Sequence, residues 1–304
     1  MSRLAFLGPH ATFTEQALRS LPESRGAELV PCVGSPAVLA AVRSGEADAG
    51  CVPIENSVEG AVGAVLDGLV GDPPLLIVRE AEVAVRFVVT ARPGTGTADV
   101  KRVGSHPHAI AQTRDWLAQH LPDAEVLLTS STAEAAAQVA RGELDAAVAA
   151  PLAAEQHGLD VLVDDVADNP GAVTRFVLVA PPGPLPAPTG HDRTTFAATT
   201  ANVPGSLLGL LAELSVRGID LTRIESRPIK DRSGEYWFHI DCTGHVADPA
   251  MGEALAALHR RCDRMRFLGS FPRSGPPGRL GATGGSGFAA AQQWLDGLRA
   301  GTLA

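Results

Sequence analysis

Thr174 and Arg175 are the adjacent residues whose side chains are best suited to chemistry. They lie in the stretch Asp168–Ala180, which begins with the turn-forming residues Asn169-Pro-Gly and continues as the β-branched, apolar run Val173–Val179. The pair therefore stands where a loop becomes a strand. A hydroxyl beside a guanidinium can donate to a carboxylate or to a leaving oxygen, because Arg stays charged and binds carboxylates through two N–H groups. The alternative is an edge-strand Arg in a surface ion pair.

Polar residues recur where an expected strand leads into an expected helix. Each of these side chains could simply cap its helix. If several of them surround one cleft, however, helix N-terminal amides and hydroxyls would together bind an anion without any lysine. The residues concerned are Thr12, Thr14, Asn56, Ser57, Ser105, His106, Ser131 and Thr132.

The composition argues against several classes of protein. Of the 304 residues, 45% are hydrophobic and 19% are charged, which suits a globular chain with two or more domains. The formal net charge is -9 and there is no Lys/Arg-rich tract, which argues against nucleic-acid binding. No segment resembles a signal peptide or a membrane span, so we expect a cytoplasmic protein that does not bind membranes.

Motifs for metals and cofactors are also missing from the sequence. The four cysteines, at positions 32, 51, 242 and 262, show neither metal-binding nor redox spacing. No Gly-x-Gly-x-x-Gly follows the first strand, and there is no Walker loop. We therefore expect neither a metal nor a cofactor.

Strands and helices alternate through the first half of the chain, which predicts an α/β fold. One helix is expected from the Ser105-His-Pro-His-Ala109 segment to His120. A faint internal repeat aligns residues 35–49 with residues 132–146, and both copies contain Gly-Glu-x-Asp after an Ala-rich helix. If the repeat is structural, it indicates two similar lobes with a ligand cleft between them.

The second half of the chain has a different organisation. A Pro-rich segment ends residues 1–181 and forms a linker at residues 182–192. Residues 193–272 then read as strand-helix-strand-strand-helix-strand, a ferredoxin-like βαββαβ domain. Its first helix is expected to bury Leu207, Leu208, Leu211 and Leu214 on one face. Residues 273–304 form a Gly/Pro-rich tail with a possible terminal helix from Phe288 to Arg299.

Six motifs, in order along the chain, resemble those of prephenate dehydratase with a C-terminal ACT regulatory domain. The catalytic ones are Gly8-Pro-His-Ala-Thr-Phe-Thr, Pro53-Ile-Glu-Asn-Ser-Val-Glu-Gly, Ser105-His-Pro-His-Ala and Thr174-Arg-Phe. The ACT-like ones are Asn202-Val-Pro-Gly-Ser-Leu-Leu and Glu225-Ser-Arg-Pro. The resemblance spans residues 3 to 272. It departs from the family at Ala11, where Gly is usual, and at Ser206, where Ala is usual.

The resemblance implies a two-lobed catalytic domain similar to periplasmic binding proteins, which converts prephenate to phenylpyruvate, water and carbon dioxide in phenylalanine synthesis. Arg175 would bind a substrate carboxylate. Thr174 matches the family's essential threonine, and its hydroxyl would hydrogen-bond the departing oxygen or relay a proton. The candidate substrate contacts are Thr12, Asn56, Ser57, Ser105, Ser131 and Thr132, with Phe176 packed behind the catalytic pair.

The resemblance further implies feedback by phenylalanine, bound to the ACT domain of a homodimer or homotetramer. The residues implied in effector binding are Asn202, Pro204, Gly205, Ser206, Leu207, Glu225 and Ser226. Free amides near Ser206 and Leu207 would receive the carboxylate of the amino acid. Two other functions stay open: a two-lobed ligand-binding protein without chemistry, and an amino-acid sensor with a degenerate first domain.

Overall fold

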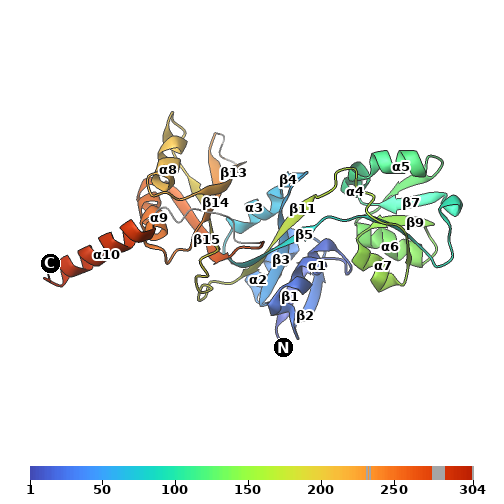
Figure 1. Cartoon of the computed structure of the whole chain (residues 1–304), viewed down its shortest axis with the longest axis horizontal. Helices are drawn as coiled ribbons and strands as arrows, with labels where there is room; N and C mark the ends of the chain where they lie inside the picture. The colour runs from blue at the N-terminus through green and yellow to red at the C-terminus, as the bar shows by residue number, and fades with distance from the viewer. Residues whose placement is uncertain (231, 233, 276–284, 303–304) are drawn as a thin grey trace. The chain divides into compact units, whose positions relative to one another are not determined.

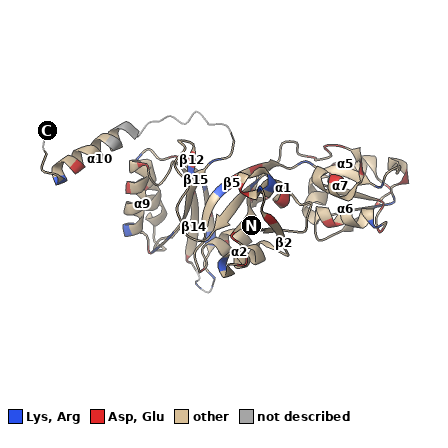
Figure 2. Ribbon diagram, turned by 90° about the horizontal axis from the view of Figure 1, so that it is seen from below, with Lys and Arg blue, Asp and Glu red and all other residues tan. Residues whose placement is uncertain are grey.

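The chain forms two compact units in the computed structural model, which describes residues 1–230, 232, 234–275 and 285–302. The first unit comprises residues 1–65 and 81–178, and the second comprises residues 66–80 and 179–304. Acidic and basic residues are interspersed along the ribbon (Figure 2). The middle of the Gly/Pro-rich tail and part of the charged turn at 231–234 lie outside the described residues.

The first sheet has the strand order β2-β1-β3-β11-β5, with β4 paired to β3. Parallel pairing of β1 with β2 and β3 follows from the helices that connect them, since parallel strands need a crossover. The elements are β1 Arg3–Leu7, α1 Phe13–Ser20, the 3₁₀ turn Pro22–Ser24, β2 Glu28–Cys32, α2 Ser35–Ser44, β3 Ala49–Asn56, β4 Gly60–Ala61, α3 Gly63–Leu69, β5 Leu76–Ala84 and β11 Val173–Ala180.

The second sheet has the order β10-β6-β9-β7-β8. Helices α4 and α5 lie on one side of it and α6 and α7 on the other (Figure 1). The elements are β6 Val88–Ala91, the 3₁₀ turn Thr97–Asp99, β7 Arg102–Ser105, α4 Pro107–Gln112, α5 Arg114–His120, β8 Glu125–Leu128, α6 Thr132–Ala140, β9 Ala146–Ala149, α7 Pro151–His157 and β10 Asp160–Val163. Two α/β sheets confirm the two-lobed fold class expected from the sequence.

The two copies of the sequence repeat have the same local structure. Gly45 and Gly142 follow α2 and α6 with φ of 79° and 80°, in the left-handed region that favours glycine. In the first copy, the Asp48 carboxylate accepts the amide of Arg3 at 2.8 Å. In the second, the Asp145 carboxylate accepts the amide of Arg102 at 2.9 Å. Each Gly-Glu-x-Asp turn therefore ties the start of a central strand to the end of a helix.

The expected helix from residue 105 to His120 is wrong in one respect, because it is broken at Thr113. The Thr113 hydroxyl donates to the carbonyl of Ala109 at 2.9 Å, which competes with the continuing helix. The Asp168 carboxylate then accepts the amides of Asp115 and Trp116 at 3.1 and 3.0 Å. A residue over fifty positions away thus caps α5, and no local pattern could predict it. Strand β10 is a further element that the sequence patterns do not predict.

The second unit contains a four-stranded antiparallel sheet with the order β13-β14-β12-β15. Its elements are β12 Asp192–Thr199, α8 Ser206–Ser215, β13 Leu221–Pro228, β14 Tyr236–Thr243, α9 Pro249–Arg261 and β15 Arg264–Pro272, followed by α10 Gly285–Arg299. This order confirms the ferredoxin-like βαββαβ arrangement. The helices cover one face of the sheet, where Phe196, Ile240, Leu210 and Leu258 form the core.

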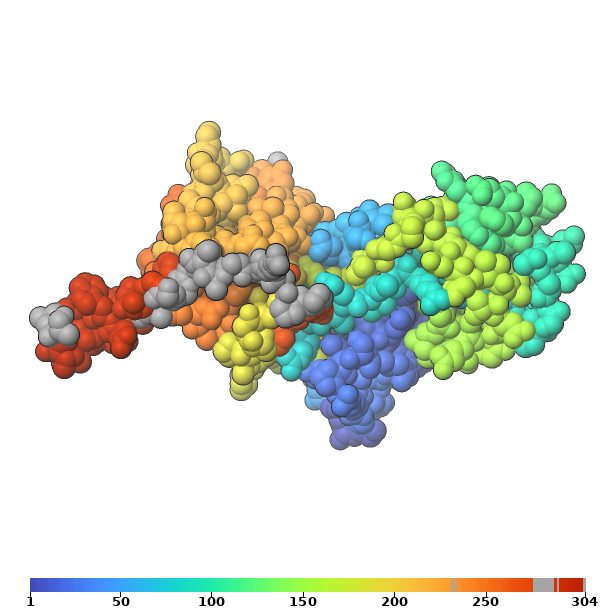
Figure 3. Space-filling view, in the orientation of Figure 1, coloured from blue at the N-terminus to red at the C-terminus, as the bar shows by residue number. Residues whose placement is uncertain are grey.

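One expectation for α8 is wrong. Leu208 is 72% exposed, whereas Leu210 and Leu214 are buried. The buried stripe therefore follows positions 207, 210, 211 and 214, which is the i, i+3, i+4, i+7 spacing of one helix face. Leu208 lies outside that stripe, on the exposed side of the helix. Figure 3 shows the segment around α8, in yellow, at the surface of the second unit.

No helix in the described parts of the chain is both long enough and apolar enough to cross a membrane.

Candidate active site

The loop-to-strand transition before Thr174 is held in place by Ser57. The Ser57 amide donates to the Val173 carbonyl at 2.9 Å, and the Val173 amide donates to the Ser57 hydroxyl oxygen at 2.9 Å. This pair of hydrogen bonds extends the contact between β3 and β11, which are neighbours in the first sheet. Ser57 thus sets where β11 begins, and with it the position of the two residues that follow Val173.

Asn56 orients the Thr174 hydroxyl. Its side-chain oxygen accepts the amides of Val58 and Glu59 at 2.8 and 2.9 Å, as in an Asx turn. Because the oxygen is committed to two backbone donors, the amide orientation is determined by the network, and Nδ2 must face Thr174. Nδ2 donates to Thr174 Oγ1 at 2.8 Å. The hydroxyl therefore accepts from Asn56, and its own proton is directed to a different acceptor.

Arg175 is on an interior strand and only 6% exposed. The alternative of an edge-strand surface pair is therefore wrong, although Arg175 does have an acidic partner. Its Nη2 donates to a carboxylate oxygen of Glu55 at 3.1 Å. The Glu55 side chain remains 39% exposed. The buried guanidinium is thus both balanced and oriented by a carboxylate from β3.

Most of the other predicted substrate-binding residues also have a structural role, as helix caps or in hydrogen bonds to the backbone. Thr12 caps α1 by accepting the Glu15 amide at 3.3 Å and donates to the Leu7 carbonyl at 3.0 Å. Ser131 caps α6 by accepting the Glu134 amide at 3.0 Å, and Thr132 is the first residue of that helix. The fully buried Ser105 donates to the Val148 carbonyl at 2.6 Å. The structure brings Asn56 and Thr174 into direct contact, whereas the hydroxyls of Thr12, Ser105 and Ser131 are bonded to backbone groups elsewhere.

Phe176 is buried, as expected of a residue that packs behind the pair. His106 is the N-cap of α4, and its ring lies edge-on to His108 at 5.0 Å between centroids. Burial, and then the neighbouring His108, lower the pKa of His106. Nδ1 of His106 accepts the His108 amide at 3.3 Å, so in the neutral ring Nε2 carries the proton and is the donor at the start of α4.

Gln112 and Glu59 are polar residues that the sequence patterns did not single out. The Gln112 side chain is buried and its Nε2 donates to Glu59 at 3.3 Å, which joins α4 to the turn after β3. The Gln112 carbonyl accepts the amide of Asp168 at 2.8 Å, at the start of the loop that leads to Thr174. The sequence does contain one signal for Gln112, because a polar residue there interrupts the apolar face of the helix that follows Ser105.

Small residues line the contact between the segment that precedes α1 and the region of α6, β9 and α7. Ala11 packs with Ala133, Ala136, Ala149 and Ala153 in one buried cluster. Ala11 has φ of 68°, which explains why glycine suits that position. Side chains this small let the segment between β1 and α1 approach α6 and α7 closely.

The start of α8 differs in detail from the expectation. Gly205 is its N-cap, with φ of 83° and no capping side chain among the described residues. The Ser206 amide donates to the Val203 carbonyl at 3.2 Å, so it is not free as expected. The Ser206 hydroxyl oxygen accepts from Thr200 at 3.2 Å. A cavity of about 520 Å³ adjoins this loop, lined by Thr199, Thr200, Ala201, Asn202, Arg232, Glu235, Asp263 and Arg264.

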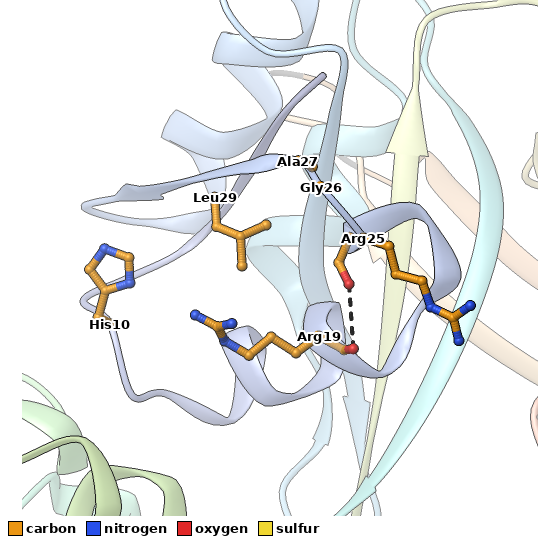
Figure 4. Close-up of a pocket in the computed structure, with 7 residues that line it drawn as sticks. His10, Arg19, Arg25, Gly26, Ala27 and Leu29 are labelled. Atoms are coloured by element: carbon orange, nitrogen blue, oxygen red, sulfur yellow. Dashed lines mark hydrogen bonds between the residues drawn. The ribbon is translucent and has the colours of Figure 1, made fainter. Parts of the chain in front are cut away.

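A separate cavity of about 540 Å³ contains none of the predicted site residues. It is lined by His10, Arg19, Ser24, Arg25, Gly26, Ala27 and Leu29. Figure 4 shows His10 and Arg19 pointing into it, whereas Arg25 points away. Arg19 is paired with Glu15, so its charge is largely balanced. Within the described residues, no cluster of His, Cys, Asp and Glu could hold a metal ion.

Comparison with known proteins identifies relatives of the whole chain. The family described as prephenate dehydratase matches residues 4–183. A prephenate dehydratase of Mycolicibacterium vanbaalenii is 48% identical over 99% of both chains. One from Amycolatopsis methanolica is 54% identical over 90% of both chains. The crystal structure of prephenate dehydratase from Arthrobacter aurescens in complex with L-Phe has a TM-score of 0.88 and 46% identity, and covers 98% of this chain and 99% of its own.

Proposed function

The chain belongs to the prephenate dehydratase family, and from this premise we propose that it converts prephenate to phenylpyruvate, water and carbon dioxide. The reaction breaks one C–C bond, and the electrons of that bond enter the ring as carbon dioxide leaves. The ring C–O bond breaks at the same time, and the departing hydroxide takes up a proton to become water. Aromatisation drives the reaction, so the protein has to hold a dianion and assist the leaving oxygen.

The observation that carries this proposal is the direction of the Asn56–Thr174 hydrogen bond, in which Asn56 is the donor. Since Asn56 donates to Oγ1, the proton on Thr174 can be donated to the leaving oxygen, which develops negative charge in the transition state. A threonine hydroxyl is too weak an acid to be the ultimate proton source, so it stabilises the oxygen or relays a proton.

Arg175 is the proposed carboxylate ligand. Its guanidinium is buried, charged and held by Glu55, so a substrate carboxylate would meet a cation that is already oriented. Phe176 supports the rotamers of the pair from behind. Ser57 holds the start of β11. The other proposed polar contacts to the substrate are Thr12, Ser105, Ser131 and Thr132.

One assay tests the proposal against its alternatives. Purified protein is mixed with prephenate, and phenylpyruvate is followed by its absorbance in alkali. Product formation that depends on Thr174 supports the dehydratase. Prephenate binding without product would support a two-lobed binding protein, and phenylalanine binding without either would support a sensor.

Regulation by phenylalanine is the second part of the proposal. We assign residues 1–181 to the catalytic domain, 182–192 to a linker, 193–272 to an ACT regulatory domain and 273–304 to a tail. The complex of the Arthrobacter aurescens enzyme with L-Phe supports an effector site in this chain too. The proposed contacts are Asn202, Pro204, Gly205, Ser206, Leu207, Glu225 and Ser226, at an interface between subunits of a cytoplasmic homo-oligomer.

Calorimetry with phenylalanine tests the effector site. The intact protein should bind it, and Gly205→Val should weaken binding, because a β-branched residue is strongly disfavoured at φ of 83° and would reshape the loop. Circular dichroism of both proteins controls for folding. An intact protein without phenylalanine binding would remove the regulatory part of the proposal and leave the catalytic part standing.

A further inference from the structure

The segment of residues 66–80 docks on the face of the second-unit sheet that is opposite the helices. Arg227 of β13 binds Asp67 through two hydrogen bonds of 3.0 and 3.1 Å. Arg266 of β15 binds Asp72 at 2.8 Å. Glu80 pairs with Arg193 of β12 at 2.9 Å. Three of the four strands are therefore joined to this segment by ion pairs.

The same contact is sterically tight at Gly269 on β15. A Cβ atom at this position would lie 2.2 Å from the carbonyl oxygen of Ile77, so only glycine allows the sheet to approach the segment this closely. Beside it, Arg193 and Arg223 both pair with the fully buried Asp241. A close-packed, charge-balanced contact of this kind has few alternative arrangements, so a displacement of one partner shifts the other.

Arg227 belongs to the Glu225-Ser-Arg-Pro motif and lies on the docking face. Side chains alternate along a strand, so Arg223, Glu225 and Arg227 share one face of β13. Arg223 is committed to Asp241 and Arg227 to Asp67. The Asp67 pair lowers the pKa of that carboxyl, with the hydrogen bond from Arg227 as the main cause. The arginine of the proposed effector motif thus contacts the docked segment.

Asp67 lies on α3, which begins at Gly63, directly after the short strand β4. Strand β4 pairs with Glu55 and Asn56 of β3. These are the residues that hold Arg175 and Thr174. A movement of α3 therefore acts on the β3–β4 hairpin, which orients both catalytic side chains.

We propose that the Arg227–Asp67 ion pair couples the effector motif to the catalytic pair, and that both are positioning residues. The proposal rests on the proposed function, since it names the route by which phenylalanine would regulate that site. Effector binding next to Glu225 and Ser226 displaces Arg227, Arg227 displaces α3 through Asp67, and the hairpin changes how Asn56 and Glu55 hold Thr174 and Arg175. Coupling between two sites commonly changes affinity by about 5- to 150-fold.

The decisive experiment compares Asp67→Asn with Asp72→Asn. Asp72 is the matched control because it lies in the same segment and pairs with an arginine outside the motif. For each protein, phenylalanine affinity is measured by calorimetry and its effect on prephenate turnover by the phenylpyruvate assay. We expect Asp67→Asn to bind phenylalanine within about threefold of the parent while turnover no longer responds to it. Asp72→Asn should keep the response.

The reciprocal change Asp67→Arg with Arg227→Asp should restore part of the response, because it re-forms an ion pair with reversed charges. A full response in Asp67→Asn would overturn the link alone. Loss of phenylalanine binding in Asp67→Asn would also overturn it, since Arg227 would then act as part of the pocket. A parent protein that turns over prephenate without binding phenylalanine would overturn the regulatory proposal itself.

Discussion

Thr174 and Asn56 illustrate how one amide can determine the direction of a hydroxyl. Two backbone amides occupy the Asn56 oxygen, which leaves its nitrogen to donate to Thr174. An unpartnered serine or threonine hydroxyl rotates to suit its surroundings. Here the Thr174 oxygen already accepts a hydrogen bond from Asn56. The hydroxyl proton is therefore preorganised to be donated to another oxygen.

We predict that Thr174→Ala retains its fold and loses about 10²–10³-fold in kcat, as expected when one transition-state hydrogen bond is removed. The phenylpyruvate assay on the parent and the variant measures this loss, and circular dichroism checks the fold. Thr174→Ser is the matched control, because it keeps the hydroxyl beside Asn56 and should retain most of the turnover. Equal kcat in the alanine variant and the parent would contradict the role of the hydroxyl.

Ala11 carries two opposing effects of similar size. Its left-handed backbone costs about 1–2 kcal/mol for a residue other than glycine. Its buried methyl group contributes about 0.8 kcal/mol by leaving water. We predict that the free energy of unfolding of Ala11→Gly lies within about 1 kcal/mol of that of the parent, since the two effects offset each other.

Ala11→Val should instead lower the free energy of unfolding by about 1–3 kcal/mol. Valine adds bulk to a buried alanine cluster, and it is a β-branched residue at a position with positive φ. Denaturant unfolding measures both variants. A valine variant as stable as the parent would show that the cluster can expand.

Helix α1 is anchored through one buried carboxylate. Glu15 accepts the Ala11 amide at 2.6 Å and Arg19 Nε at 2.8 Å, and it lies 3.3 Å from His10 Nδ1. Burial raises the pKa of Glu15, but the Ala11 amide and Arg19 together outweigh burial and lower it. The ionised carboxylate therefore joins the turn before the helix to the helix itself.

We predict that Glu15→Gln lowers the free energy of unfolding at pH 7 by about 1–3 kcal/mol, because hydrogen bonds to a charged group are lost. The folded pKa lies below the unfolded one, so the stabilisation is complete above the ordinary carboxyl range. It is lost as pH falls through the lowered pKa. Urea unfolding of both proteins from pH 7 to pH 3 measures the difference. A difference that stays constant with pH would contradict an ionised Glu15.

At the scale of the whole molecule, the second unit exposes apolar residues around α8 and β13. Val203, Leu208 and Val216 are each more than half exposed, and Ile224 is exposed on the edge strand β13. An edge strand and an apolar helix surface together suit pairing with a second copy. They support the proposed homo-oligomer.

We predict that Leu208→Glu lowers the molecular mass in solution, because a carboxylate would be buried at the proposed subunit interface. Sedimentation velocity of the parent and the variant measures the mass. Leu128→Glu is the control, since Leu128 is similarly exposed on β8 of the first unit and should leave the mass unchanged. A Leu208 variant with the mass of the parent would place the interface elsewhere.

The sequence by itself determined the features that depend on neighbours a few residues apart. The alternation of strands and helices predicted the α/β lobes and the βαββαβ domain, and the caps at Thr12 and Ser131 satisfy amides three residues away. The Gly-Glu-x-Asp repeat also proved to be structural, because a glycine at positive φ and an aspartate acceptor act locally. Short-range hydrogen bonds and side-chain periodicity leave a readable pattern.

Only the tertiary structure decided which of these residues meet. Asn56 and Thr174 are 118 positions apart, and they touch because β3 and β11 are neighbours in the sheet. Strand order also brings Glu55 to Arg175, while Asp168 caps α5 from a distant loop. Contacts between residues so far apart depend on how whole elements pack, and the side chains carry no local mark of their partner.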